Sequence, residues 1–160
     1  MGQSIVTSLN SSLESAVRLL IILDAEYPTE RNLDELIALD HVAAHTEDFQ
    51  GPPSLHPALP LRSGDMGAAR EAIRGGIEVL VHRGMAEIKL SADGIRFVAS
   101  DGLHPVVAVL QSPYLLALKE RAEWVRSTGL LNTPADVRDV IKSIAEAWPV
   151  QSQQAGDVYA

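Results

Sequence analysis

The chain has 160 residues, a length that suits one domain with a small helical appendage. Its apolar fraction of 46% is ordinary for a globular protein, and its lack of cysteine excludes disulfides and thiolate metal sites. The net charge of −8 disfavours strong autonomous binding to nucleic acid, because an acidic chain gains nothing from counterion release. The start of the chain lacks a signal-peptide pattern, and the apolar run 19–23 is too short to span a bilayer. We therefore expect a cytoplasmic protein with no membrane partner.

A first helix is expected from about Ser11 to the Tyr27-Pro28 pair, since Ser11 and Glu14 have the spacing of a capping box. Its apolar surface is wide, which predicts burial on more than one side. The apolar residues of this segment are Leu13, Val17, Leu19, Leu20, Ile21, Ile22 and Leu23.

A second helix is expected after Asn32, which repeats the capping spacing with Glu35. Asp40 continues the apolar stripe of this helix, an unusual place for a carboxylate. A buried carboxylate needs a partner, and arginine offers a bidentate one. The pattern therefore predicts that Asp40 pairs with Arg62 in the loop that follows; the alternative is that Arg62 faces a partner protein or a DNA phosphate.

The segment 51–65 is the most distinctive part of the chain, with four prolines and two glycines in the run GPPSLHPALPLRSGD. Each proline fixes its own φ and pushes the preceding residue toward extended conformations, so the segment should be rigid. Its leucines favour a packed loop over a disordered one. We expect the loop 51–64 to pack against the helices, with structural or interface roles for Gly51, Pro52, Pro53, His56, Pro57 and Arg62.

A third helix is expected from about Asp65 to Arg83, with Gly84 at its left-handed end. Glycines 75 and 76 lie in its middle, which predicts either a kink or the close approach of another backbone. Next come two β segments, 85–90 and 95–99, joined by a loop that contains Asp-Gly, a strong hairpin signal. Three helices followed by a hairpin are typical of the winged-helix order.

Arg70 and Arg74 lie one turn apart on this third helix, where a winged helix reads DNA. Weak DNA contact by these two residues is one interpretation. The other is a solvated face of mixed charge, because Glu71 and Glu78 dilute the basic patch.

The remaining chain predicts a short helix over 103–110, a helix from Pro113 to Gly129, and a last helix from Thr133 to Pro149. The polar stretch 151–160 is expected to be a disordered tail. The chain is thus divided into a winged-helix-like domain (8–130), a C-terminal helix (131–150) and the tail. The candidate partner-docking residues are Tyr114, Trp124, Ile141 and Trp148, with packing inside the domain as the alternative.

No motif for catalysis or cofactor binding is found in the sequence. His41 and His45 share a helix face and could bind a metal together with His56 or Glu47, but no HExxH motif accompanies them. Both histidines are more simply placed at a helix end, where the dipole favours them. A phosphate-binding glycine loop and a GxSxG elbow are also missing. We expect no enzymatic activity, no metal and no cofactor.

The sequence resembles the middle component of bacterial ABC-three-component systems from about Leu13 to Val125. The strongest match is His45 followed by GPPSLHP at 51–57, then Pro60, Arg62, Gly64 and Asp65. Weaker matches follow in the correct order: Arg83-Gly84-Met85, Gly94-Ile95, Ser112-Pro113-Tyr114 and the AEWV run at 122–125. The chain departs from the family in a less basic third helix and in the segment after Leu130.

This resemblance implies a non-catalytic adaptor that links an SMC-like ABC ATPase to an effector, often a nuclease. Such systems are associated with antiphage and antiplasmid defence, as in the Lamassu type, and DNA would be met only through the complex. Two alternatives stay open. One is a winged-helix DNA-binding transcriptional regulator, and the other is a small hydrolase that uses His45 or His56.

Overall fold

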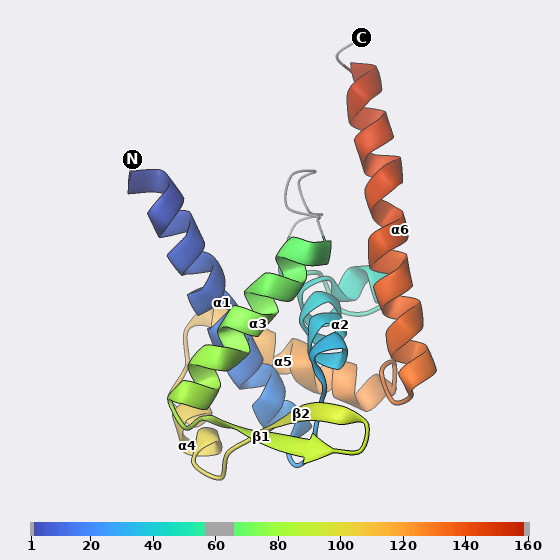
Figure 1. Cartoon of the computed structure of the whole chain (residues 1–160). Coiled ribbons are helices and arrows are strands. Elements are labelled where there is room, and N and C mark those ends of the chain that lie inside the picture. Colours follow the sequence, from blue (N-terminus) through green and yellow to red (C-terminus); the bar gives the residue numbers. More distant parts are fainter. Residues whose placement is uncertain (1, 57–65, 159–160) are drawn as a thin grey trace.

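The computed structural model describes residues 2–56 and 66–158, and side chains within 12–56 and 66–146. The fold is mainly helical, with one small hairpin and further helices after it, as the sequence predicts (Figure 1). The elements in chain order are α1 (Gly2–Glu26), α2 (Leu33–Ala44), the 3-10 helix η1 (Thr46–Phe49), α3 (Met66–His82), β1 (Ala86–Ser91), β2 (Gly94–Ala99), α4 (Leu103–Ala108), α5 (Pro113–Thr128) and α6 (Pro134–Val158).

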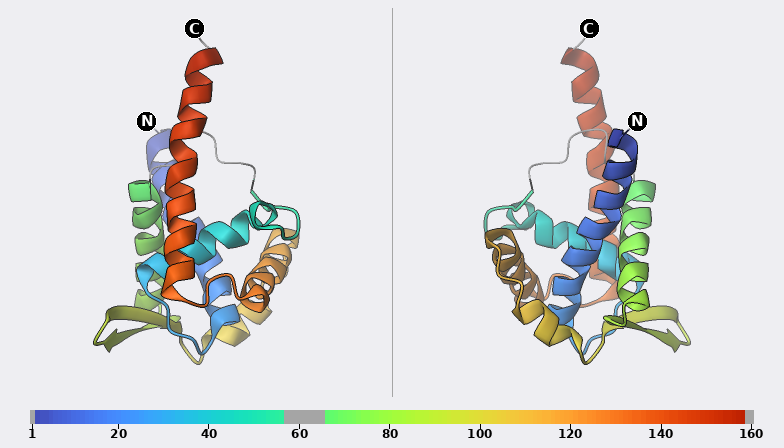
Figure 2. Two further views of the ribbon diagram at one scale, coloured as in Figure 1. Left: turned by 90° about the vertical axis from the view of Figure 1, so that its right-hand side faces the viewer. Right: turned by 90° about the vertical axis from the view of Figure 1, so that its left-hand side faces the viewer.

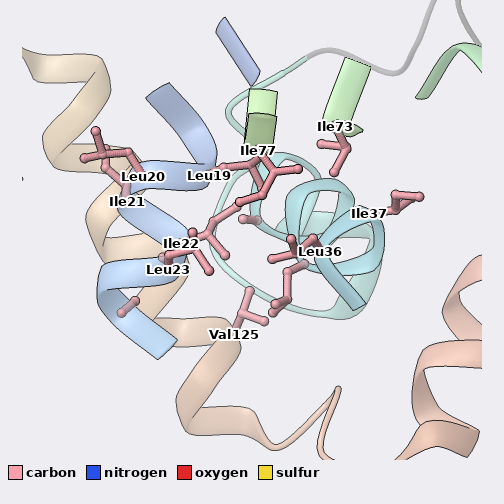
Figure 3. Packing of buried hydrophobic residues seen from close by; sticks show 14 of the residues in the cluster. Leu19, Leu20, Ile21, Ile22, Leu23, Leu36, Ile37, Ile73, Ile77 and Val125 are labelled. Atoms are coloured by element: carbon pink, nitrogen blue, oxygen red, sulfur yellow. The ribbon is translucent and has the colours of Figure 1, made fainter. Parts of the chain in front are cut away.

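The middle of α1 forms the centre of the hydrophobic core. Residues 19–23 are all buried there, and α2, α3, α4 and α5 contact α1. Burial around the whole helix explains why five successive apolar residues are needed, since a surface helix would show them on one stripe only. Figure 3 shows this arrangement, with Ile77 of α3 and Leu36 of α2 turned toward the leucines and isoleucines of α1. The prediction of burial on more than one side is confirmed.

The glycine pair in α3 lets that helix lie directly against α1. A Cβ atom added to Gly76 would lie 2.9 Å from the backbone nitrogen of Ala16 and 3.0 Å from the carbonyl carbon of Ser15. The backbone of α1 cannot yield as a flexible side chain would, so only glycine fits at this position. Of the two expected explanations for the glycines, close approach is the one that the structure shows.

The hairpin is joined to the helices at its base by a charged network. Arg31 binds Glu26 (Nε to Oε2, 2.9 Å) and lies near Glu35, which Arg96 of β2 approaches to 3.6 Å. The backbones of Arg31 and Phe97 also exchange two hydrogen bonds of 2.8 Å. Glu26 and Glu35 are buried, so this network fixes the root of the hairpin. Beyond the root the hairpin projects from the helical body (Figure 2).

Both ends of the chain differ from the expected bounds. α1 begins at Gly2 instead of Ser11, because a capping-box spacing is only a local signal and a serine inside a helix costs little. α6 continues past Pro149 to Val158, so the expected helix end near 150 and the disordered tail are both corrected. A proline inside a helix removes one hydrogen bond at about 3 kcal/mol, which bends or weakens a helix but does not always end it.

Two residues of the expected core stripe of α1 are exposed. Leu13 and Val17 face solvent, with exposed fractions of 55% and 38%, whereas Leu20 and Ile21 further along the stripe are buried. The difference arises because α3 covers the side of α1 that carries Ser15 and Ala16, whereas Leu13 and Val17 lie on the side that lines the groove described next.

Candidate protein-docking groove

An open groove lies between α1 and the start of α5, beside the described end of the proline-rich loop. Its volume is about 560 Å³. The residues that line it are Leu13, Glu14, Val17, Arg18, His56, Ser112, Tyr114 and Leu115. Leu13 and Val17 form an apolar wall, and Tyr114 is exposed at the rim. Apolar side chains with a few fixed polar groups are the usual composition of a binding surface.

Arg18 supplies the main charge of the groove and is already bound. Its Nε donates to Asp40 Oδ1 at 2.7 Å and its Nη2 to Asp40 Oδ2 at 3.2 Å, a bidentate pair that joins α1 to α2. Both side chains are largely buried. Burial acts to lower the pKa of Arg18, but the charge and hydrogen bonds of Asp40 outweigh it and the pKa is raised. The guanidinium is therefore held in place and charged.

Asp40 thus pairs with an arginine, as its place on an apolar stripe predicts, and this arginine comes from α1. The sequence analysis assigned this partner to Arg62, which lies outside the described residues. A signal for Arg18 was present: this residue directly precedes the buried run 19–23, on a helix whose whole circumference was expected to be covered. A cation at such a place needs an anion on a neighbouring helix.

A chain of aromatic rings runs from α2 to the rim of the groove. The rings of His41 and His45 lie 4.7 Å apart, and those of His45 and His56 lie 6.2 Å apart. His56 stacks on Tyr114 with 5.9 Å between ring centroids, and its Nε2 is hydrogen-bonded to the tyrosine hydroxyl at 2.7 Å. The chain of rings links the second helix, the loop and α5.

Burial disfavours the charged form of these histidines. Burial, followed by the neighbouring His45, lowers the pKa of His41 to about 4. Burial is also the main cause that lowers the pKa values of His45 and His56. Within the described ranges, no three side chains of the metal-binding types are grouped so as to hold an ion. The three histidines therefore contact one another as rings.

The first part of the proline-rich loop is fastened to the helices. The backbone nitrogens of Leu55 and His56 both donate to the Ala44 carbonyl, at 3.1 and 3.2 Å. The Thr46 hydroxyl donates to the Pro52 carbonyl at 2.7 Å. Packing against the helices is therefore found for residues 51–56, while Pro57 and the rest of the loop lie outside the described residues.

Contacts with α5 complete this attachment. Arg121 donates from Nε and Nη2 to the Pro53 carbonyl, at 3.1 and 2.9 Å. A Cβ on Gly51 would lie 2.6 Å from the Trp124 ring, so this glycine allows the loop to touch the tryptophan. Trp124, a candidate docking residue, thus packs against the loop of its own domain.

The other candidate residues are scattered. Ile141 packs partly against the core from α6, whose Val137 and Val140 are buried. Arg70 is bound to Asp34 of α2, and Arg74 is exposed on α3. Trp148 lies in α6, and its side chain is outside the described part. Of the three proposed docking residues whose side chains are described, Tyr114 alone lies in the groove.

The fold and the groove define a small helical protein with a preformed apolar surface and a projecting hairpin. The chain belongs to the ABC-three component (ABC-3C) system Middle Component 2 family, whose model matches residues 8–151. Membership makes it a component of a multi-component system with protein partners. No curated protein and no solved structure matches the chain. Among the helices described, none is long and apolar enough to cross a membrane.

Proposed function

We propose that this chain is a non-catalytic adaptor that links an SMC-like ABC ATPase to an effector, a nuclease, in a Lamassu-type antiphage or antiplasmid complex in the cytoplasm. Membership of the middle-component family supports the presence of such partners. One structural observation carries the adaptor role: among the described residues, the groove and the hairpin each expose several apolar side chains, and the two places are separate. A linking subunit needs two surfaces that can be occupied at once.

The groove is suited to bind protein more than to perform chemistry. Arg18 is neutralised by Asp40, and the imidazoles of His41 and His45 lie against each other beneath the surface. What the groove offers a partner is the apolar wall of Leu13 and Val17 and the ring of Tyr114, the kind of surface that dominates binding energy at protein interfaces.

The alternative, a winged-helix DNA-binding regulator, has some support from topology. The order of α1, α2, α3, β1 and β2 and the bridge between Arg31 and Phe97 agree with a winged-helix arrangement, which we also propose. The charges favour the adaptor instead. Arg70 is bound to Asp34, and the chain carries a net charge of −8, which opposes DNA binding.

The test is co-expression of the tagged chain with the ATPase and effector of its own system. The wild type should elute with both in size-exclusion chromatography. Leu13→Asp should lose one of them, because it places a charge on the apolar wall of the groove, with little change in melting temperature. Val109→Asp is the matched control, since Val109 is also exposed but lies outside the groove.

Two results would contradict the adaptor role. One is a wild-type chain that associates with neither component. The other is a purified chain that alone binds DNA with sequence specificity at physiological salt, which would identify a regulator.

A further inference from the structure

We propose that β1 is a docking strand: an extended segment of the ATPase or effector, apolar at alternate positions, adds to its free edge. This inference rests on the proposed adaptor function and assigns the second of its two surfaces. It follows from the side chains of the hairpin, from the direction of its backbone groups and from its charges.

One face of the hairpin is apolar and becomes more exposed toward its tip. The register pairs Ile88 with Phe97 and Leu90 with Ile95, so these four side chains lie on the same face. Phe97 packs against the core, whereas Ile88, Ile95 and Leu90 have exposed fractions of 50%, 55% and 82%. One face of the hairpin is thus apolar from the hydrophobic core at its root to the exposed side chains at its tip.

The outer edge of β1, which faces away from β2, carries backbone groups that can form hydrogen bonds with a partner. Ser91 and Gly94 flank a two-residue turn, so they form a hydrogen-bonded pair. Because hydrogen-bonded and non-hydrogen-bonded pairs alternate along the hairpin, the backbone N–H and C=O groups of Leu90 and Ile88 point away from β2. The corresponding outer edge of β2 is bonded to Arg31 through Phe97. For β1, no backbone hydrogen bond to another described residue reaches Ile88 or Leu90.

Such an edge is usually protected in proteins that do not use it. Proline, charged side chains on the strand, an inward-pointing charge or a covering helix are the common means. Here the charges of β1, Glu87 and Lys89, lie on the opposite face and pair with each other at 3.1 Å. An exposed strand edge beside exposed apolar side chains is the arrangement that binds an extended peptide by strand addition.

The charges favour a neutral protein segment as the occupant. Glu87 and Lys89 cancel each other, and Arg96 is engaged with Glu35 and with the Glu30 carbonyl. The tip therefore lacks the basic groups that a nucleic-acid backbone requires. A second copy of this chain is also disfavoured as the occupant. β1 has six residues, whereas each side of a stable dimer contributes roughly 20–30 residues to the interface. An extended peptide segment needs less area, because strand addition binds it through main-chain hydrogen bonds and contacts with alternate side chains.

Two substitutions test the docking strand: Leu90→Asp changes its face alone, and Ile88→Pro changes its edge together with one side chain of the face. Leu90→Asp should weaken assembly with one component by about tenfold or more, because a partner would have to bury the new charge. Ile88→Pro removes an outward N–H without touching the hydrogen bonds to β2, and it should also weaken assembly. Val109→Asp, at a similarly exposed apolar residue outside the hairpin, is the matched control and should assemble normally.

Hydrogen exchange followed by NMR gives the direct measurement. In the assembled wild-type complex, the amides of Ile88 and Leu90 should exchange at least about tenfold more slowly than in the free chain. If the complex forms with these amides unprotected and Leu90→Asp assembles normally, the docking strand is wrong and the adaptor role stands. If the wild type assembles with neither component, both proposals fail. Protection of the same amides in a dimer of the chain alone would replace the proposed partner by a second copy.

Discussion

At the groove, Leu13 and Val17 lie beside polar groups that are bound to one another, whereas at the hairpin the exposed Leu90 lies on the open edge strand β1. The groove is therefore a preformed surface whose shape depends on internal contacts. The hairpin is a surface whose hydrogen bonds are completed by whatever docks there.

This difference separates stability from binding. A change beneath the groove should affect both, because the same residues hold the domain together and shape the surface. A change at the tip of the hairpin should affect binding alone, because Leu90 contacts little within its own domain. The following three predictions examine the groove side of this comparison in order of decreasing expected effect.

The largest effect is expected from Arg18→Met, which leaves the largely buried Asp40 carboxylate without its partner. Removing one member of a buried pair costs about 3–5 kcal/mol, and the slight exposure of this pair places the expected loss at about 3 kcal/mol. In a chain of this length that is a fall in melting temperature of roughly 6–12 °C. Thermal unfolding followed by circular dichroism measures it.

Two variants make this prediction specific to the ion pair. Arg74→Met removes an exposed arginine from α3 and should change stability by less than about 0.5 kcal/mol. The double variant Arg18→Met with Asp40→Leu removes both charges and should recover much of the loss. A single Arg18→Met variant as stable as the wild type would show that the pair does not support the groove.

The second prediction is that the domain is destabilised by acid through His41. The pKa of His41 is lowered to about 4, below the usual value near 6.5 expected in the unfolded chain, so between these values only the unfolded chain binds the proton. Stability is complete above about pH 6.5 and falls as the pH drops toward 4. His41 alone should remove about 2 kcal/mol between pH 7 and pH 5.

Urea unfolding at the two pH values tests this, with His41→Gln and a matched His82→Gln. The first variant should flatten the pH dependence, and the second, which changes an exposed histidine of α3, should not. His45 and His56 act in the same direction, while Asp40 and Asp48 oppose the effect on His41. An equal slope in wild type and His41→Gln would contradict the assignment to this residue.

The sequence predicted the local structure of this protein better than its contacts. Capping at Asn32, the left-handed Gly84 and the hairpin around residues 91–94 depend on neighbours in the chain, and each is found. The pairing of Asp40 depends on how two helices lie against each other. Two arginines fitted the chemistry, and the sequence does not say which helix face meets Asp40.

The groove could not be predicted for a similar reason. Leu13 and Val17 carry the same apolar pattern as Leu20 and Ile21, so periodicity assigned all four to the core. Their exposure depends on which sides of α1 the neighbouring helices cover, which is a property of the assembled fold. The resemblance carried by the GPPSLHP run identified the family, because rigid proline-rich loops are distinctive in sequence even where their contacts are not.

The smallest stability effect on the groove side is expected from Tyr114→Phe. This change removes the hydroxyl that is hydrogen-bonded to His56 and leaves the two rings stacked. The loss should be about 1 kcal/mol or less, since water can reach the freed imidazole nitrogen at the rim. Binding should fall by severalfold, because the loop beside the groove is no longer fastened to α5 at this point.

Tyr27→Phe is a close control: Tyr27 is similarly exposed and its hydroxyl donates to Asp101 at 3.1 Å, but it lies away from the groove. Titration of each purified variant with the partner component should separate them, with Tyr27→Phe binding like the wild type. Equal binding by both variants would mean that the groove does not depend on the contact between the loop and Tyr114.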